Sequence, residues 1–325
     1  MPHALVTGGA GFIGSHLSRA LLEKGYRVRV FDNFSTGKKE NLLGIENQVE
    51  IVKGDLADDQ ALLQAVRGID TIFHLGAIPS VPRSLENPRQ THQANVVGTF
   101  NLLLAARPYP IKRLVYSSSS SVYGNKAILP KEESMLPEPL SPYAASKLAG
   151  EYDCSVFHSV YGTPTVSLRY FNVFGPRQDP NSLYAAVIPK FITQLLQGKP
   201  ATIYGDGLQT RDFTYVQDVI RANLLAAEAG PEILGKIYNI AGGKSVSLLE
   251  LLAEIENTLG FHIPPLFEPS RKGEVRDSLA SIERAKSDLK YMPRFSLREG
   301  LKETIAWFSS GLGKENGKFL QRKGA

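Results

Sequence analysis

The stretch GGAGFIG at residues 8–14 lies between a short apolar run, Ala4–Val6, and a segment of helical periodicity. Three of its four glycines, Gly8, Gly11 and Gly14, are spaced three residues apart. In this spacing, glycines permit a tight turn, a close approach of the backbone to a pyrophosphate, and close packing of the helix on the strand. The pattern predicts that the chain begins with a dinucleotide-binding unit.

A second expected strand, Arg27–Phe31, ends in Asp32, 18 residues beyond Gly14. An acidic side chain at this distance commonly binds the ribose hydroxyls of adenosine. Because its carboxylate would repel the 2′-phosphate of NADP, Asp32 favours NAD. Lys38 and Lys39 lie close enough to leave NADP open as an alternative.

Farther along, short apolar runs alternate with segments of helical pattern, which is typical of an α/β fold with a Rossmann-type, doubly wound parallel sheet. The expected strands are residues 4–6, 27–31, 49–52, 71–74, 114–116, 165–168 and 237–240. The expected helices are residues 58–66, 89–106, 144–160, 186–197, 216–228, 247–259 and 297–309.

The alternation stops after Asn172, in a segment rich in proline and glycine. We therefore predict a smaller C-terminal substrate-binding lobe beside the dinucleotide-binding domain. The domain would take residues 1–171 and about 214–245, and the lobe residues 172–213 and about 246–309. Residues 310–325 would form a polar tail.

The run SSSSSVYG at residues 117–124 is followed by Tyr143 and Lys147. Four residues apart on an expected helix, these two side chains share one face. An ammonium beside a phenol favours the phenolate, so Lys147 is expected to lower the pKa of Tyr143 from its usual value of about 10. Together with a serine hydroxyl, the pair predicts a site that moves a proton on or off an alcohol.

The composition agrees with a soluble cytoplasmic enzyme. The 325 residues carry a formal net charge of +5, too diffusely distributed to predict a nucleic-acid partner. No run approaches the roughly 20 apolar residues that span a bilayer, and the first residues lack signal-peptide features. The single cysteine, Cys154, excludes an internal disulfide and argues against a thiolate metal site, so we expect no metal.

These motifs, together with Arg169-Tyr170-Phe171-Asn172, resemble the extended short-chain dehydrogenase/reductases. The nearest likeness, over residues 2–308, is to the UDP-hexose 4-epimerases. It implies NAD-dependent epimerisation at C4 of a UDP-hexose through a transient 4-keto sugar. Related dehydratases and decarboxylases carry an acid just after the active-site hydroxyl, where this chain has Ser120 and Ser121.

The resemblance assigns roles to three catalytic side chains. Tyr143 would remove the proton of the sugar 4-hydroxyl, Lys147 would hold the nicotinamide ribose, and Ser119 would hydrogen-bond the developing keto oxygen. The cofactor contacts implied are Gly8, Gly11, Phe12, Ile13, Gly14, Asp32, Asn33, Asp55, Leu56, Leu75, Ala77, Asn95 and Tyr170, besides Tyr143 and Lys147. The nucleotide-sugar contacts implied are Arg83, Ser84, Ser118, Asn172, Val187, Arg211, Arg271, Glu274 and Ser278, besides Ser119.

Some positions leave alternatives open. Arg83 and Ser84 either bind the sugar or only anchor their loop. Pro79 stands where many galactose-type epimerases have a lysine near the cofactor phosphate, which implies a weaker hold on the dinucleotide.

The likeness also bears on which sugar is used. Glucose-restricted epimerases have a bulky tyrosine where this chain has Ser278, so the resemblance implies room for an acetamido group. Glucuronate epimerases have an arginine where Asp179 falls, and an aspartate would repel a substrate carboxylate. We therefore expect UDP-Glc/UDP-Gal and UDP-GlcNAc/UDP-GalNAc as substrates, with UDP-glucuronate epimerisation as the alternative.

Two further expectations follow from the family. Its members commonly dimerise through the helices at 89–106 and 144–160, so we expect a homodimer. A non-catalytic protein that binds NAD or a nucleotide sugar is the alternative from another class, although such proteins usually lose Tyr143 or Lys147 first.

Overall fold

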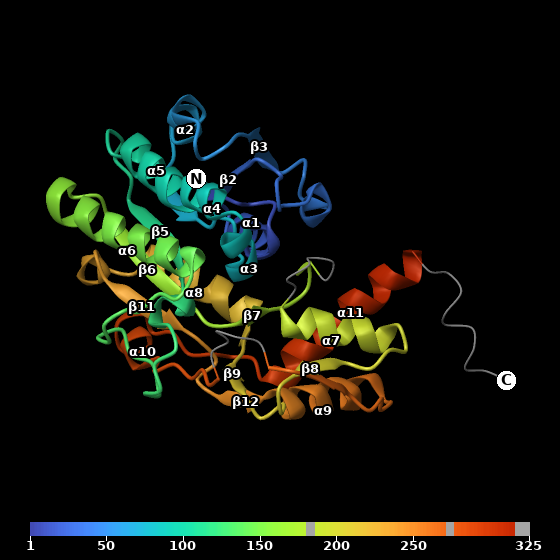
Figure 1. Ribbon diagram of the computed structural model, residues 1–325. Helices are drawn as coiled ribbons and strands as arrows, with labels where there is room; N and C mark the ends of the chain where they lie inside the picture. The colour runs from blue at the N-terminus through green and yellow to red at the C-terminus, as the bar shows by residue number, and fades with distance from the viewer. Residues whose placement is uncertain (180–185, 271–275, 316–325) are drawn as a thin grey trace.

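A seven-stranded sheet, parallel throughout, forms the centre of the computed structural model, which describes residues 1–179, 186–270 and 276–315, with side chains to residue 311 (Figure 1). The strand order is β11-β6-β5-β4-β1-β2-β3. Their bounds are β1 His3–Thr7, β2 Arg27–Asp32, β3 Val49–Lys53, β4 Thr71–His74, β5 Arg113–Ser119, β6 Thr165–Tyr170 and β11 Ile237–Ile240. The predicted doubly wound α/β fold is confirmed, since the strand order reverses between β1 and β4.

Helices cover both faces of this sheet because alternate strand residues point to opposite sides. On β1, Leu5 packs in the core beneath α2 (Asp59–Ala65), α5 (Gly98–Ala106) and α6 (Pro142–Tyr161). Ala4 and Val6 pack in the other core, against α1 (Phe12–Glu23) and α8 (Val216–Glu228). All these strands except β3 are buried along most of their length, as expected for a parallel sheet.

A second lobe lies beside the carboxyl ends of the strands (Figure 1). Its helices are α7 Val187–Leu196, α9 Leu248–Leu259 and α11 Leu297–Glu315, which pack on one another. Its strands form three small pairs: β7 Val173–Phe174 with β10 Thr214–Tyr215, β8 Thr202–Tyr204 with β13 Leu266–Glu268, and β9 Thr210–Asp212 with β12 Ser245–Ser247. The chain returns from this lobe to the sheet through α8 and β11.

The start of α6 is determined by local sequence. The hydroxyl of Ser141 accepts a hydrogen bond from the Ala144 backbone N–H at 3.1 Å, and Pro142 occupies the first helical position. The helix ends at Gly162, whose φ of 70° is left-handed. Tyr143 is therefore held in the first turn of the helix, directly beside the ends of β5 and β6.

The structure differs from the prediction in several elements. The expected helix 89–106 is divided into α4 (Pro88–His92), a π-helical turn (Gln93–Val97) and α5. The remaining short elements are α3 (Val81–Glu86), α10 (Glu283–Leu289) and 3₁₀ turns at Lys39–Leu42, Ser120–Tyr123 and Pro231–Ile233. Helix α11 continues six residues beyond its predicted end, and the rest of the expected tail lies outside the described residues. Within the part of the chain that is described, no helix is both long and apolar enough to span a membrane.

Candidate active site

A cleft of about 1170 Å³ runs along the carboxyl edge of the sheet, beside the reversal between β1 and β4. Ligands bind at this position in open parallel sheets because the loops on either side diverge there. The glycine turn forms one wall. Gly8 has a φ of +67°, and its N–H donates to the Phe31 carbonyl at 2.8 Å. A Cβ added to Gly14 would lie 2.2 Å from the Gly8 carbonyl oxygen, so the third glycine is required for helix α1 to meet the turn.

Gly14→Ala therefore tests the glycine turn. The added methyl would push α1 away from Gly8, because backbone atoms cannot yield at 2.2 Å. We expect the variant to lose most of its co-purified dinucleotide, measured by chromatography of the nucleotide released on acid denaturation. Gly25→Ala is the control for a glycine substitution, because a Cβ there meets no atom within 4 Å, although its φ of +79° adds some strain. Retention of dinucleotide equal to that of the unmodified chain would contradict the role given to Gly14.

Asp32 is held beneath the glycine turn. One carboxylate oxygen accepts from the Ala10 N–H at 2.9 Å and the other from the Phe34 N–H at 2.8 Å. Burial raises the pKa of Asp32, and these two N–H groups lower it. Asn33 donates to Asp55 at 2.7 Å. With Leu56, these side chains line the end of the cleft where the sequence predicted an adenosine.

Ser119, Tyr143 and Lys147 meet at the other side of the cleft, where β5 ends against α6. The Ser119 hydroxyl caps the turn Ser120–Tyr123 by accepting from the Ser121 N–H at 3.2 Å. Burial raises the pKa of Tyr143, and a hydrogen bond with Ser119 opposes that rise. The phenol and the hydroxyl are therefore in contact, as a proton-transfer site requires.

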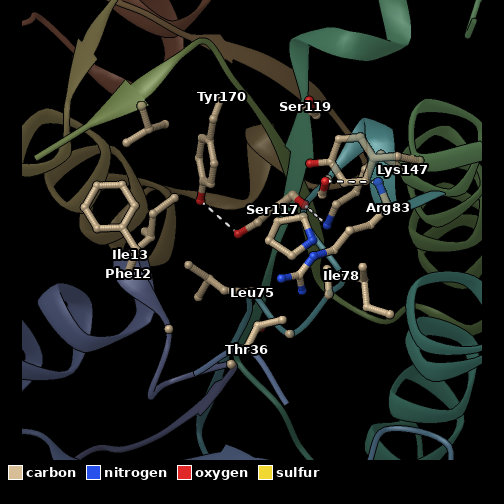
Figure 2. A pocket seen from close by; sticks show the side chains of 18 of the residues that line it. Phe12, Ile13, Thr36, Leu75, Ile78, Arg83, Ser117, Ser119, Lys147 and Tyr170 are labelled. Atoms are coloured by element: carbon tan, nitrogen blue, oxygen red, sulfur yellow. Dashed lines mark hydrogen bonds between the residues drawn. The ribbon is translucent and has the colours of Figure 1, made fainter. Parts of the chain in front are cut away.

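Lys147 is buried at the floor of this site. Its ammonium donates to the Ser117 carbonyl oxygen at 2.8 Å and lies 5.2 Å from the centre of the Tyr116 ring. Figure 2 shows Ser117 between Lys147 and Tyr170, whose hydroxyl is 3.0 Å from the Ser117 hydroxyl. Burial lowers the pKa of Lys147 to about 8. The expected lowering of the Tyr143 pKa by Lys147 is not found: burial raises this pKa, and the group that lowers it is Ser119, through a hydrogen bond.

Most of the side chains expected to contact the nucleotide sugar line the same cleft. These are Arg83, Ser118, Ser119, Asn172, Arg211 and Ser278. Figure 2 shows the Arg83 side chain extending into the pocket. The predicted cofactor contacts other than Asn95 also line the cleft. Arg271 and Glu274 lie outside the described residues.

Three of the expected contacts lie outside the cleft lining, and a fourth is bound to a buried side chain. Ser84 is fully buried and outside the cleft lining, because its hydroxyl donates to the Val81 carbonyl within α3 at 2.6 Å. Asn95 is also outside the lining, and its amide instead binds the backbone of Ile78. Val187 begins α7 and does not reach the cleft lining. Ser118 lines the cleft, but its hydroxyl donates to buried Glu151 at 2.5 Å, so it is engaged in the core.

Asp179 has a different environment from the one assumed in the sequence argument. Its carboxylate lies 3.1 Å from the Lys38 ammonium, which comes from the loop after β2. Because the Lys38 charge offsets that of Asp179, we expect Asp179 to repel a substrate carboxylate less strongly. Beside it, Arg177 also lines the cleft and contacts the His16 ring at 3.2 Å, at a position to which the sequence assigned no role.

Comparison with known proteins agrees with this geometry. Residues 4–241 match the model of the NAD-dependent epimerase/dehydratase family. The chain is 40% identical to the UDP-glucose 4-epimerase of Mycolicibacterium smegmatis, over 94% of this chain and 97% of that protein. The similar solved structures include the following two.

The first is the UDP-N-acetylglucosamine 4-epimerase of Methanobrevibacter ruminantium in complex with UDP-N-acetylmuramic acid. Its TM-score is 0.91 at 42% identity, over 95% of this chain and 99% of that one. The second is the UDP-glucuronic acid 4-epimerase of Bacillus cereus with UDP-glucuronic acid and NAD. Its TM-score is 0.88 at 37% identity, again over 95% and 99%.

Proposed function

The chain belongs to the NAD-dependent epimerase/dehydratase family, and from this premise we propose that it interconverts the C4 epimers of UDP-hexoses with NAD as its cofactor. The observation that supports this most directly is the contact between Tyr143 and Ser119 in a cleft that also presents a glycine turn and Asp32. No carboxylate follows Ser119 in its turn, where Ser120 and Ser121 stand. The site therefore lacks the acid that elimination of water would require there.

In this proposal Tyr143 takes the proton of the sugar 4-hydroxyl and later returns it. The Ser119 hydroxyl, already in contact with Tyr143, hydrogen-bonds the same sugar oxygen as it changes between alcohol and ketone. The glycine turn and Asp32 would hold NAD⁺, which would supply the acceptor for the C4 hydride and its return to the other face of the sugar. Lys147, four residues along α6 from Tyr143, would hold the nicotinamide ribose.

The proposed substrates are UDP-Glc/UDP-Gal and UDP-GlcNAc/UDP-GalNAc. Ser278 supports the second pair, because this small side chain lines the cleft where a bulky one would occupy the space of an acetamido group. The likeness to the UDP-N-acetylglucosamine 4-epimerase points in the same direction. UDP-glucuronate stays as the second candidate, since Lys38 pairs with Asp179 and one similar structure holds that substrate.

The assay that tests the proposal uses the purified protein without added NAD. UDP-Glc, UDP-GlcNAc and UDP-GlcA are incubated separately and the epimers are resolved by chromatography. We expect equilibration of the first two. Turnover of UDP-GlcA alone would transfer the proposal to the second candidate. No turnover of any of the three, even after NAD is supplied, would favour a non-catalytic binding protein.

We also propose that the protein is a homodimer, paired through α5 and α6. Apolar side chains on the outer face of these helices are exposed, among them Phe100 (42%), Tyr152 (56%) and Val156 (51%). Leu103 on the same helix belongs to the core. An exposed apolar face of this kind is typical of a surface that pairs with another chain.

Val156→Glu tests this arrangement, because two copies of the charge would be buried without partners. We expect light scattering to give about twice the chain mass of 35.6 kDa for the unmodified protein and about one chain mass for the variant. Met292→Glu, at an exposed apolar residue away from these helices, is the control and should stay dimeric. A monomeric unmodified protein would contradict the proposal.

A further inference from the structure

A third side chain lies on the same face of α6 as Tyr143 and Lys147. Glu151 follows Lys147 by four residues, one helical turn farther from the cleft. Between them Gly150 leaves space for Tyr116, since a Cβ on Gly150 would lie 2.3 Å from the Tyr116 hydroxyl. That hydroxyl donates to the Lys147 carbonyl oxygen at 3.2 Å, so β5 and α6 are in close contact at this turn.

The Glu151 carboxylate is completely buried and ties α6 to two strands. Arg169 of β6 donates Nε to Oε1 at 2.8 Å and Nη2 to Oε2 at 2.7 Å, a two-bond geometry that fixes both groups. Ser118 of β5 donates to Oε1 at 2.5 Å. Ser118 precedes Ser119, and Arg169 precedes Tyr170, so each partner adjoins a residue of the candidate site.

Glu151 also determines the charge balance around Lys147. The titratable groups that face this ammonium are Tyr143, Glu151 and Cys154 on α6, Tyr116 on β5 and His74 on β4. Burial lowers the pKa of His74 to about 3, and it raises the pKa values of Tyr116, Tyr143 and Cys154. These four groups are therefore neutral near pH 7, and Glu151 is the one negative charge among those named.

We propose that Glu151 is a positioning residue that acts through Lys147: bound to Arg169 and Ser118, it locks the catalytic helix to β5 and β6, and its charge, one turn along the same face of α6, favours the charged form of the buried ammonium. This role goes beyond the proposed function. It rests on the proposed function only for the use that the enzyme makes of Lys147. A buried carboxylate that merely closed a packing contact would not influence the protonation of Lys147.

The test follows the titration of Lys147 through stability, which needs no turnover. With a pKa of about 8 when folded and 10.5 as the reference value, Lys147 holds fewer protons in the folded chain between these pH values. Stability from this group therefore rises with pH across that window and is constant below it. Thermal unfolding from pH 6 to 10 is compared between each protein and the same protein carrying Lys147→Met, so that the difference reports Lys147 alone.

Four variants separate charge from packing. Glu151→Gln removes the negative charge. We expect the onset, which is the pH at which the Lys147 contribution to stability begins to rise, to fall by about one pH unit. A single nearby charge has an effect of this size at an effective dielectric constant of about 20. Arg169→Gln leaves Glu151 to Lys147 alone and should raise the onset. The double variant, neutral at both positions, should return it toward the original value. Phe157→Leu, at a buried apolar residue farther along α6, should lower the melting temperature without moving the onset.

A lower melting temperature with the same onset in all four variants would overturn the proposal, since it would make Glu151 a packing residue only. If Glu151→Gln alone does not fold, the opposite shifts expected for Arg169→Gln and the double variant decide the matter. The pH profile of kcat for UDP-Glc and UDP-GlcNAc gives a second readout, in which the alkaline limb should move with the onset. Absence of turnover would count against the proposed function and leave the stability result valid.

Discussion

Tyr143→Phe is expected to lower kcat by about 10³-fold, within the range of about 10²–10⁴ that general acid–base catalysis supplies. The substitution keeps the ring in the first turn of α6 and removes only the hydroxyl that contacts Ser119. Substrate still enters the same cleft, so KM should change little. The measurement is epimer formation under saturating UDP-Glc, followed by chromatography.

Tyr161→Phe is the matched control, since Tyr161 ends the same helix outside the cleft lining and stacks with Arg107 at 4.2 Å. It should retain full activity. A Tyr143→Phe variant with more than a tenth of the original kcat would show that another group moves the proton.

Ser278→Tyr is expected to lower kcat/KM for UDP-GlcNAc by about 100-fold, equivalent to about 2.7 kcal/mol in the transition state. The phenol would fill the space that Ser278 leaves in the cleft wall. UDP-Glc has a hydroxyl in place of the acetamido group, so its kcat/KM should stay within about threefold, well under the tenfold that 1.36 kcal/mol represents. Both values come from initial rates with each substrate on the same preparation.

The control places a tyrosine close by but outside the cleft. Ser245 is exposed, and its hydroxyl donates to the Ser278 carbonyl at 3.3 Å, so Ser245→Tyr perturbs the same loop without entering the cleft. It should leave the ratio of the two substrates unchanged. Equal losses on both substrates in Ser278→Tyr would mean that this side chain does not determine selection at C2.

Much of the fold was readable because its signals are local and repeated. The strands at β4 and β11 and the helix α8 match their predicted bounds, since apolar runs and helical periodicity extend through each of them. Helix α3 has six residues and β7 has two, too short for any period to be recognised. The π-helical turn at Gln93–Val97 lies inside a segment whose overall pattern is helical, so the sequence predicted one continuous helix.

The site was readable to a different extent. Glycine positions and the spacing of Tyr143 and Lys147 predicted a cleft whose lining includes both. Ser84 and Asn95 lie outside this lining and hydrogen-bond to nearby backbone groups. The directions of those backbone groups cannot be predicted from residue type. Ion pairs between residues far apart in the sequence could not be predicted either. Lys38 pairs with Asp179, and Glu151 with Arg169, only in the folded chain.

The edge strand of the sheet has a consequence for how the chain is made. Strand β11 pairs with β6, yet the ribosome reaches it only after the inserted segments of the second lobe. At 5–20 residues per second, the roughly 70 residues between them take about 4–14 s to synthesise. During that interval β6 presents an unpaired edge of Thr165–Tyr170, a surface open to pairing with other nascent chains. Biosynthesis thus has a vulnerable period that ends when residue 240 leaves the ribosome.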